Sequence, residues 1–277
     1  MEGIIALLTD FGEKGQHYIA AMKAIILKIN PRVKIIDLSH TITPFSILEA
    51  LYILTTSYKY FPKGTIFVTV VDPGVGSKRE ILAIKTKSNY YFIGPNNGIF
   101  TNLLKSEIVE CINIQNEEFY NHPVSSTFHG RDIMAPIAAY ISKNEVFTLS
   151  NLGPNFDYKD IIKFSSGFEF DLEKGSIKTL IQYVDSFGNG TTTIQITKNK
   201  IGDIGFKLEN DSKISLIIKG NKYQATFTSH FSSVSANSIL LLVGSTGFLE
   251  ISINQGNASK TLDFKVGDKI LLNIEGV

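Results

Sequence analysis

The sequence is poor in several residue types, and each shortage excludes a class of protein. It contains one cysteine, Cys111, and no tryptophan among its 277 residues. A single cysteine excludes a disulfide within the chain, and the apolar context VECINI favours a buried thiol over a nucleophile. No apolar run reaches the roughly 20 residues of a membrane-spanning helix, and the start, MEGIIALLTDFG, does not resemble a signal peptide. We therefore expect a cytoplasmic protein with no membrane partner.

The chain also lacks an excess of either charge. Its 27 lysines and arginines are balanced by 26 aspartates and glutamates, and neither a basic stripe nor an acidic tail is present. Binding to a nucleic-acid backbone requires concentrated positive charge, so we expect no nucleic-acid partner. Hydrophobic residues make up 43% of the sequence, which is ample for the core of a globular protein.

The first part of the chain alternates short apolar runs with longer amphipathic stretches. The runs IIALLT, VKIIDLS and TIFVTVV are typical of buried strands, whereas HYIAAMKAIILKIN and SILEALYILTTSYKYF have helical spacing. The alternation continues as far as the helix-like RDIMAPIAAYIS. Strands that alternate with helices favour a mostly parallel sheet covered by helices. We predict an N-terminal α/β domain over residues 1–166.

Beyond FSSGFEFDLEKGSI the pattern changes to short alternating runs without helical period. These runs are separated by turn residues such as Gly-Asn and Asn-Gly, and they include TLIQYVD, TTTIQI, ISLIIK, YQATFTS, SILLLVG, FLEISI and KILLNI. Short strands separated by turns are typical of an all-β domain. We predict such a domain over residues 175–277, with the boundary near residues 166–175.

The segment VVDPGVGSKRE stops a run of β-branched residues at an acid, a proline and glycines. Asp72 therefore stands at the end of a predicted strand, and Arg79 follows it by seven residues. Ligands of α/β proteins commonly lie at strand ends, so the pair is a candidate site. A capped turn with a solvated Arg79 explains the same residues and stays open at this point.

Two other strand ends carry polar residues with alternative explanations. Asp10 in LLTDFGEKGQ can accept hydrogen bonds from a ribose diol or cap the helix that follows. The letters DFG also occur in kinases, but neither an HRD loop nor a strand lysine accompanies them. His129 in STFHGRDIMAP, beside Gly130, can approach a ligand or serve a structural role.

Taken in order, TDFG, VVDPGVGS, PNNGIF, TFHGRD, DSFGN and GFLEIS…GNAS extend across nearly the whole chain. In this order they resemble the S-adenosyl-L-methionine (SAM) hydrolases, also called SAM hydroxide adenosyltransferases, which are relatives of fluorinating and chlorinating enzymes. The resemblance implies an N-terminal α/β domain, a C-terminal β-barrel-like domain and a homotrimer with active sites between subunits. It also implies the reaction, in which water or hydroxide displaces methionine at the 5′ carbon and gives adenosine and L-methionine.

The resemblance assigns roles to three residues around the attacking water: Asp72, Arg79 and His129. The sulfonium of SAM is already a good leaving group, so the reaction needs a positioned, desolvated nucleophile and neither a metal nor a separate cofactor. A positive arginine favours developing hydroxide character, and Asp72 or His129 orients the water or accepts its proton. Which of these groups takes the proton is left open by the sequence.

The resemblance also implies the substrate contacts. Asp10 matches the carboxylate for the ribose diol, and Phe45 stands where relatives carry an aromatic residue beside the sugar. Asp185 matches the acid for the methionine ammonium, and Ser245 the hydroxyl for the methionine carboxylate. The remaining matches are adenine contacts: Asn189, Phe231, and the backbone of Gly256 and Ala258. The sequence departs from the family at Asn96, where relatives usually have aspartate, and at Thr191, where the fluorinating enzyme has tryptophan.

Three alternative functions follow from the same residues. A SAM-dependent halogenase is disfavoured because a resident carboxylate repels a halide in a dry pocket, and because the segment after Asp72 lacks the extra loop of the fluorinating relatives. An adenosine- or SAM-binding module without turnover is disfavoured by the intact Asp72, Arg79 and His129. A structural, β-rich interaction protein is disfavoured by the polar residues at strand ends.

Overall fold

The computed structural model describes residues 3–105, 108–143, 147–165, 167–171, 175–198, 200–202 and 206–274. The chain divides into two compact units between Phe164 and Ser165, here called the N-terminal and C-terminal units. Residues 166 and 172–174, which belong to the predicted boundary, lie outside the described residues. The exact domain limits, 1–166 and 175–277, therefore stay predictions.

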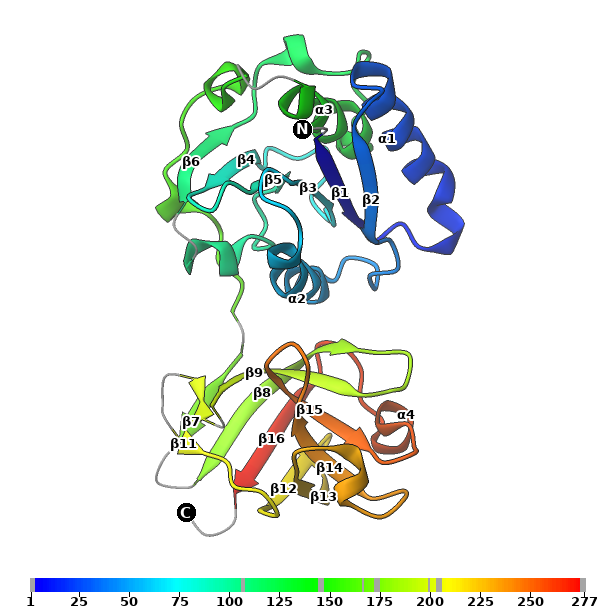
Figure 1. The fold of residues 1–277 in the computed structure, drawn as a ribbon, viewed down its shortest axis with the longest axis vertical. Coiled ribbons are helices and arrows are strands. Elements are labelled where there is room, and N and C mark those ends of the chain that lie inside the picture. The colour runs from blue at the N-terminus through cyan, green and yellow to red at the C-terminus, as the bar shows by residue number, and fades with distance from the viewer. Residues whose placement is uncertain are drawn as a thin grey trace. The chain divides into compact units, whose positions relative to one another are not determined.

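The N-terminal unit is built on a six-stranded sheet with the order β2-β1-β3-β5-β4-β6 (Figure 1). The strands are β1 (Ile4–Thr9), β2 (Lys34–Ser39), β3 (Ile66–Val70), β4 (Ile81–Thr86), β5 (Tyr91–Pro95) and β6 (Ile108–Asn113). Strands β2, β1, β3 and β5 pair in parallel, whereas β4 runs antiparallel to both of its neighbours, β5 and β6. The prediction of a mostly parallel sheet is confirmed.

Helices cover both faces of this sheet. They are α1 (Gln16–Ile29), α2 (Ile47–Ser57) and α3 (Ala135–Lys143). Alternate residues of β1 point to opposite faces: Ile5 and Leu7 pack in one cluster with α1 and α3, and Ala6 and Leu8 pack in another with α2. Because both faces are covered, the central strands β1 and β3 are apolar almost throughout, whereas the edge strand β2 is more exposed and carries Lys34 and Asp37.

The C-terminal unit is a closed β-barrel. Its elements are β7 (Glu169–Asp171), β8 (Ser176–Val184), β9 (Gly190–Thr197), β10 (Lys200–Ile201), β11 (Phe206–Lys207), β12 (Lys213–Ile218), β13 (Asn221–Phe227), β14 (Ile239–Val243), β15 (Phe248–Ile253), the short helix α4 (Ala258–Leu262) and β16 (Lys269–Ile274). Seven strands close the ring in the order β9-β15-β14-β13-β12-β16-β8, and β8 pairs back onto β9. Strands β13 and β14 are parallel, and the other neighbours in the ring are antiparallel. The barrel-like all-β prediction is confirmed.

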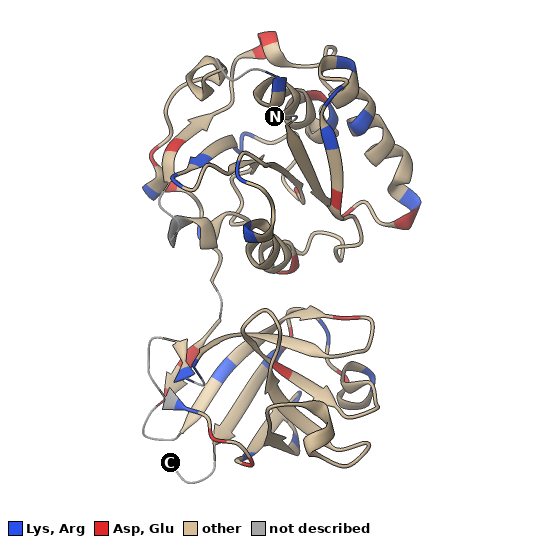
Figure 2. Cartoon of the chain, in the orientation of Figure 1, with Lys and Arg blue, Asp and Glu red and all other residues tan. Residues whose placement is uncertain are grey.

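Charged residues of both signs are interspersed over both units (Figure 2). This distribution matches the balance of charges along the sequence. In the part of the chain that the structure describes, no helix combines the length and apolar character needed to cross a membrane.

Candidate active site

The carboxyl ends of β1 and β3 bring two aspartates to one edge of the sheet. The strands pair in parallel, with Thr9 opposite Val70, so Asp10 and Asp72 both follow at this edge. Burial, and then the nearby charge of Asp72, raise the pKa of Asp10, although hydrogen bonds from backbone N–H groups act against the shift. Two carboxylates at a strand edge form a polar centre in an otherwise apolar layer.

Arg79 reaches the same edge because of the direction of β4. The chain leaves β3 at Val70, turns through residues 72–77 and enters β4 at Ile81. Since β4 is antiparallel to β5, its first residue lies at the edge where β3 and β5 end. A parallel β4 would start at the opposite edge and carry Arg79 away from Asp72.

Asp72 and Arg79 form a buried ion pair. Arg79 Nε lies 2.7 Å from Asp72 Oδ1 and 2.8 Å from Oδ2, and Arg79 Nη2 also donates to Oδ2. The side chains are only 4% (Asp72) and 10% (Arg79) exposed. The alternative of a solvated Arg79 is therefore wrong. A bidentate guanidinium–carboxylate pair fixes both groups in orientation as well as in charge.

His129 completes a polar cluster, which we define as Asp72, Arg79 and His129. Arg79 Nη2 lies 3.1 Å from His129 Nδ1. A guanidinium can only donate, so Nδ1 carries the lone pair and the proton of the neutral ring is on Nε2. Burial, followed by the charge of Arg79, lowers the pKa of His129, and the charges of Asp72 and Asp132 compensate in part. The imidazole is therefore neutral at neutral pH.

A π-helical turn, Gly130–Met134, positions His129 at its N-terminus. Gly130 lies against β3, and a β-carbon there would stand 2.9 Å from Val70 Cγ1. Asp132 is fully buried in this turn and accepts hydrogen bonds from Arg131, Asn121 and the Ser125 N–H. Burial acts to raise the pKa of Asp132, but these bonds outweigh it and lower the pKa. The sequence analysis did not identify Asp132, which anchors the segment before His129.

Asp10 is held by the segment that carries Phe45. The Phe45 N–H donates to Asp10 Oδ2 at 2.8 Å. Phe45 has a left-handed φ of 68°, uncommon for a bulky residue, and its ring is exposed, at 69% for the whole residue. The N-terminal caps of the following helices are Gly12 and Gly15, and neither is capped by a side chain. The helix-cap alternative for Asp10 is therefore wrong.

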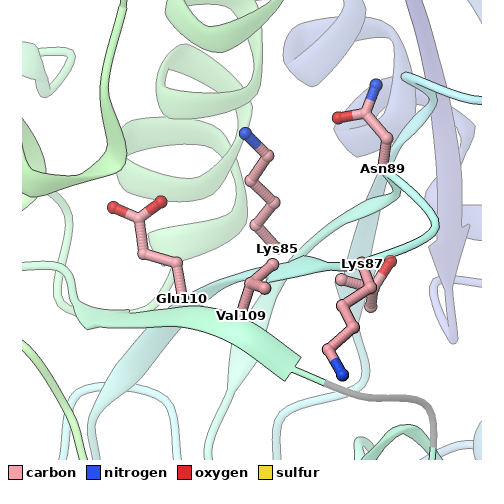
Figure 3. A pocket seen from close by; sticks show the side chains of 6 residues that line it. Lys85, Lys87, Asn89, Val109 and Glu110 are labelled. Atoms are coloured by element: carbon pink, nitrogen blue, oxygen red, sulfur yellow. The ribbon is translucent and has the colours of Figure 1, made fainter.

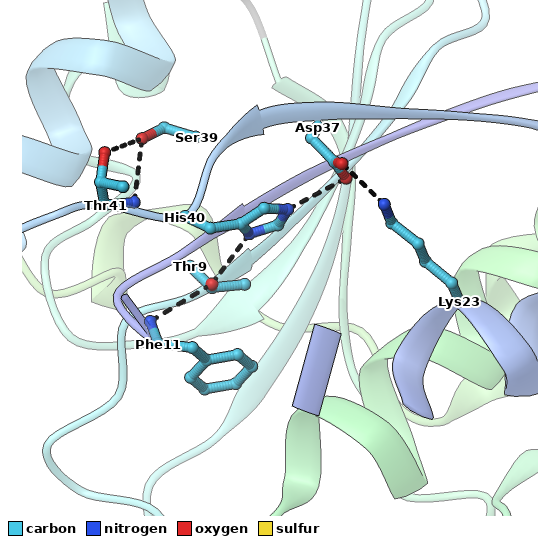
Figure 4. A network of polar contacts seen from close by, with 7 residues as sticks. All are labelled: Thr9, Phe11, Lys23, Asp37, Ser39, His40 and Thr41. Carbon is cyan, nitrogen blue, oxygen red and sulfur yellow. Dashed lines mark hydrogen bonds and ion pairs between the residues drawn. The ribbon is translucent and has the colours of Figure 1, made fainter. Parts of the chain in front are cut away.

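A chain of polar contacts supports the loop that begins at Asp10 (Figure 4). Lys23 Nζ donates to Asp37 at 2.6 Å, and His40 Nε2 lies 3.0 Å from the other oxygen of Asp37. His40 Nδ1 lies 3.0 Å from Thr9 Oγ1, which in turn accepts from the Phe11 N–H at 3.4 Å. The carbonyl of His40 also accepts from the Gly12 N–H at 2.7 Å. The sequence analysis missed this network, which ties both sides of Asp10 to β2.

Asn96 and Asn97 are structural in this arrangement. Buried Asn96 donates to Glu80 Oε2 at 3.2 Å and accepts from the Ile162 N–H at 2.9 Å. Asn97 donates to the Val71 carbonyl at 2.8 Å. The two amides therefore hold the residues beside Arg79 and Asp72 in place. Asn96, which stands where family members usually have aspartate, thus has a structural role in this protein.

The predicted residues of the C-terminal unit surround a pocket of about 820 Å³. Those that line it are Asp185, Asn189, Phe231, Ser245 and Gly256. Ala258 is fully buried at the start of α4, and its neighbour Asn257 reaches the pocket instead. The predicted site residues thus form two clusters, one in each unit.

Asp185 and Glu250 are the two carboxylates of this pocket. Asp185 accepts hydrogen bonds within its own turn from Phe187 N (3.0 Å), Asn189 N (2.8 Å) and Asn189 Nδ2 (2.9 Å). Burial, and then the charge of Asp185, raise the pKa of Glu250, and a hydrogen bond from Thr191 acts in the opposite direction. The sequence analysis missed Glu250, although an acid inside the apolar run FLEISI was a usable signal.

A second pocket, of about 460 Å³, lies by β4 and β6 (Figure 3). Its lining residues are Lys85, Thr86, Lys87, Asn89, Val109 and Glu110, and none of them was predicted as a site residue. Within the described ranges, no group of three or more His, Cys, Asp or Glu side chains is placed to hold a metal ion.

Comparisons with known proteins agree over most of the chain. Residues 5–153 match the model of the SAM hydroxide adenosyltransferase N-terminal domain, and residues 179–271 match that of the C-terminal domain. An (R)-S-adenosyl-L-methionine hydrolase from Methanocaldococcus jannaschii is 37% identical over 96% of this chain and 94% of its own length. A fluorinase from Nocardia brasiliensis is 22% identical over 98% of this chain and 97% of its own.

A crystal structure of an uncharacterized conserved protein from Thermotoga maritima has the same fold. It superimposes with a TM-score of 0.84 at 33% identity, covering 97% of this chain and 99% of that one. With both family models matched and a relative of 37% identity aligned over nearly its whole length, this chain belongs to the SAM hydroxide adenosyltransferase family.

Proposed function

We propose that this protein hydrolyses S-adenosyl-L-methionine to adenosine and L-methionine. The observation that carries the proposal is the polar cluster, because Asp72, Arg79 and His129 meet at a strand edge within hydrogen-bonding distance. The full-length relative from Methanocaldococcus jannaschii, named as a hydrolase of this substrate, supports the same reaction.

The cluster suits attack by water on the 5′ carbon. The sulfonium leaves without a general acid, so the protein has to position the water and stabilise hydroxide character. Arg79 supplies the positive charge. Arg79 donates a hydrogen bond to Nδ1 of neutral His129. The ring therefore has no free lone pair and offers only Nε2–H, as a donor. Asp72 is the group left to accept the proton, and we assign that role to it.

The two clusters divide the substrate between them in this proposal. Asp10 Oδ2 accepts the Phe45 N–H, and Asp10 Oδ1 accepts hydrogen bonds from the two ribose hydroxyls. The exposed Phe45 ring covers the sugar. Asp185 and Ser245 hold the methionine moiety. Asn189, Phe231 and the backbone of Gly256, which line the pocket, hold the adenine. No separate cofactor or metal enters this mechanism.

We also propose that the active molecule is a homotrimer, in which the N-terminal unit of one subunit and the C-terminal unit of a neighbour supply each site. The family resemblance supports this arrangement. The division of the predicted contacts into one cluster per unit is consistent with it, because each cluster alone binds only part of the substrate.

Halogenation is the competing reaction, because fluorinases are also relatives of this chain. The buried Asp72 carboxylate disfavours a halide at the nucleophile position, since like charges repel in a dry pocket. Incubation with SAM in concentrated chloride or fluoride should give adenosine as the sole nucleoside, as measured by chromatography. A 5′-halo nucleoside as the main product would replace the hydrolase assignment with halogenation.

Two controls sharpen this experiment. Asp72→Ala should lose adenosine formation while it still binds SAM in calorimetry, because the adenosyl and methionyl contacts are made elsewhere. A chelator should leave the wild-type rate unchanged. Loss of activity with the chelator, restored by a divalent ion, would contradict the metal-free mechanism. SAM binding without any turnover by the wild type would instead indicate a binding module.

A further inference from the structure

We propose that Glu250 is a substrate-contacting residue that binds the α-ammonium group of the methionine moiety together with Asp185. The inference rests on the proposed function, because it assigns one part of SAM to one wall of the C-terminal pocket. Glu250 lies on β15, and it lines the same pocket as Asp185 and Ser245.

The two carboxylates differ in the number of hydrogen bonds that they already accept. Asp185 already accepts three hydrogen bonds inside its own turn, two on Oδ1 and one on Oδ2, so of the roughly four lone-pair sites of a carboxylate one, on Oδ2, is left for a ligand. Glu250 Oε1 has one long contact, 3.5 Å from Thr191 Oγ1, and Oε2 accepts no hydrogen bond from the described residues. An ammonium group carries three N–H donors, and Glu250 is the carboxylate that is free to accept them.

The pocket wall leaves room for the Glu250 carboxylate at Gly244. A β-carbon on Gly244 would stand 2.0 Å from Glu250 Oε1, so a glycine is required for the carboxylate to lie where it does. The next residue, Ser245, carries the hydroxyl predicted to bind the methionine carboxylate. The Glu250 carboxylate lies against Gly244, the chain neighbour of Ser245, so one wall of the pocket carries both an acceptor and a donor, as the zwitterionic end of an amino acid needs.

The charges that line the pocket favour a cationic ligand group. The described residues that line the pocket include two carboxylates and neither lysine nor arginine. Burial and the charge of Asp185 raise the pKa of Glu250, so two ionised carboxylates on this pocket wall carry an electrostatic cost. A ligand cation between the two carboxylates removes this cost. SAM offers two such cations, the ammonium and the sulfonium, and the test must separate them.

Calorimetry with two thioethers separates the two charges. S-adenosyl-L-homocysteine has the ammonium but no sulfonium, and 5′-S-(3-carboxypropyl)-5′-thioadenosine lacks only the amino group. The wild type should bind the first about 10- to 100-fold more tightly, as expected for charge-assisted hydrogen bonds. Glu250→Gln should lose most of this preference. Glu209→Gln, which removes an exposed carboxylate of the same unit, should keep it.

Adenosine is the internal control for an intact pocket. It lacks the amino-acid moiety, so Glu250→Gln should bind it as the wild type does. An unchanged preference for the ammonium ligand in Glu250→Gln would overturn the proposal and leave the hydrolase assignment standing. A loss confined to SAM, with both thioethers unaffected, would also overturn it, because Glu250 would then recognise the sulfonium. Failure of the wild type to bind any of these nucleosides would overturn both proposals.

Discussion

Asp10 has a structural contact on one carboxylate oxygen and a proposed substrate contact on the other. One oxygen accepts the Phe45 N–H, and the proposed partner of the other is the ribose diol. Asp10→Ala should therefore raise KM, by roughly 10²-fold if two charge-assisted bonds are lost, and change kcat little. Steady-state kinetics on SAM tests this, with exposed Asp160→Ala as the control. A lower kcat at unchanged KM would contradict the assignment.

His129 gives a pH prediction. Its pKa lies below the ordinary value of 6.5 because burial and Arg79 disfavour the imidazolium. The neutral ring should therefore persist as the pH falls through 6.5, and kcat should decline only at lower pH, where protonation breaks the contact with Arg79. The contribution of neutral His129 to the free energy of unfolding also decreases as the pH falls. It is fully present above the unfolded-state pKa and is lost as the pH falls through the lower folded-state pKa.

A kcat profile of the wild type and His129→Asn measures this effect. The asparagine oxygen can accept from Arg79 but does not titrate, so the acidic decline assigned to His129 should disappear from the variant. A wild-type decline centred at or above 6.5 would show that the imidazolium is not disfavoured in the site.

Sequence reasoning identified the polar cluster and missed the residues around it. Asp72 and His129 interrupt apolar patterns at predicted strand and helix ends, where polar side chains stand out. His40 and Asp132 have no comparable signal, because their roles depend on partners brought together by folding, whereas Glu250 interrupts the apolar run FLEISI and was overlooked. Thr9 and His40 are 31 residues apart, and Thr191 and Glu250 are 59 apart.

At the scale of elements, the π-helical turn couples packing to the site. Gly130→Ala would place a β-carbon 2.9 Å from Val70 Cγ1, closer than real side chains approach. The turn must then move away from β3, which should lower the free energy of unfolding by about 1–3 kcal/mol. It should also lower kcat, because His129 moves with the turn. Thermal unfolding and kinetics well below the Tm test both effects, and unchanged values would show that the turn tolerates the methyl group.

The periodicity of the sequence predicted the alternation of strands and helices but not the direction of β4. Buried strands read as continuous apolar runs whether their neighbours are parallel or antiparallel, so ILAIKT contains no directional signal. The direction is nonetheless what brings Arg79 to Asp72. The π-helical turn was also not predictable, because GRDIMAP fits an ordinary helix start.

At the scale of the whole molecule, the proposed trimer predicts complementation between inactive subunits. Asp72→Ala damages the N-terminal cluster and Asp185→Ala the C-terminal one. If each site combines units of neighbouring subunits, every mixed trimer contains one site with neither lesion. Dissociation, mixing and reassembly should therefore recover part of the activity. Mixed trimers that form and stay inactive would place the whole site within a single chain.

The parallel pair β13–β14 has a consequence for how the C-terminal pocket arises. In a closed ring of strictly antiparallel neighbours the direction must alternate at every step, which requires an even number of strands. This ring has seven, so one pair has to run in the same direction. Parallel neighbours cannot be joined by a tight hairpin, and the chain returns through residues 228–238. That return carries Ser229, His230 and Phe231 into the pocket wall. The odd number of strands therefore requires the long connection through residues 228–238, and this connection forms part of the pocket wall.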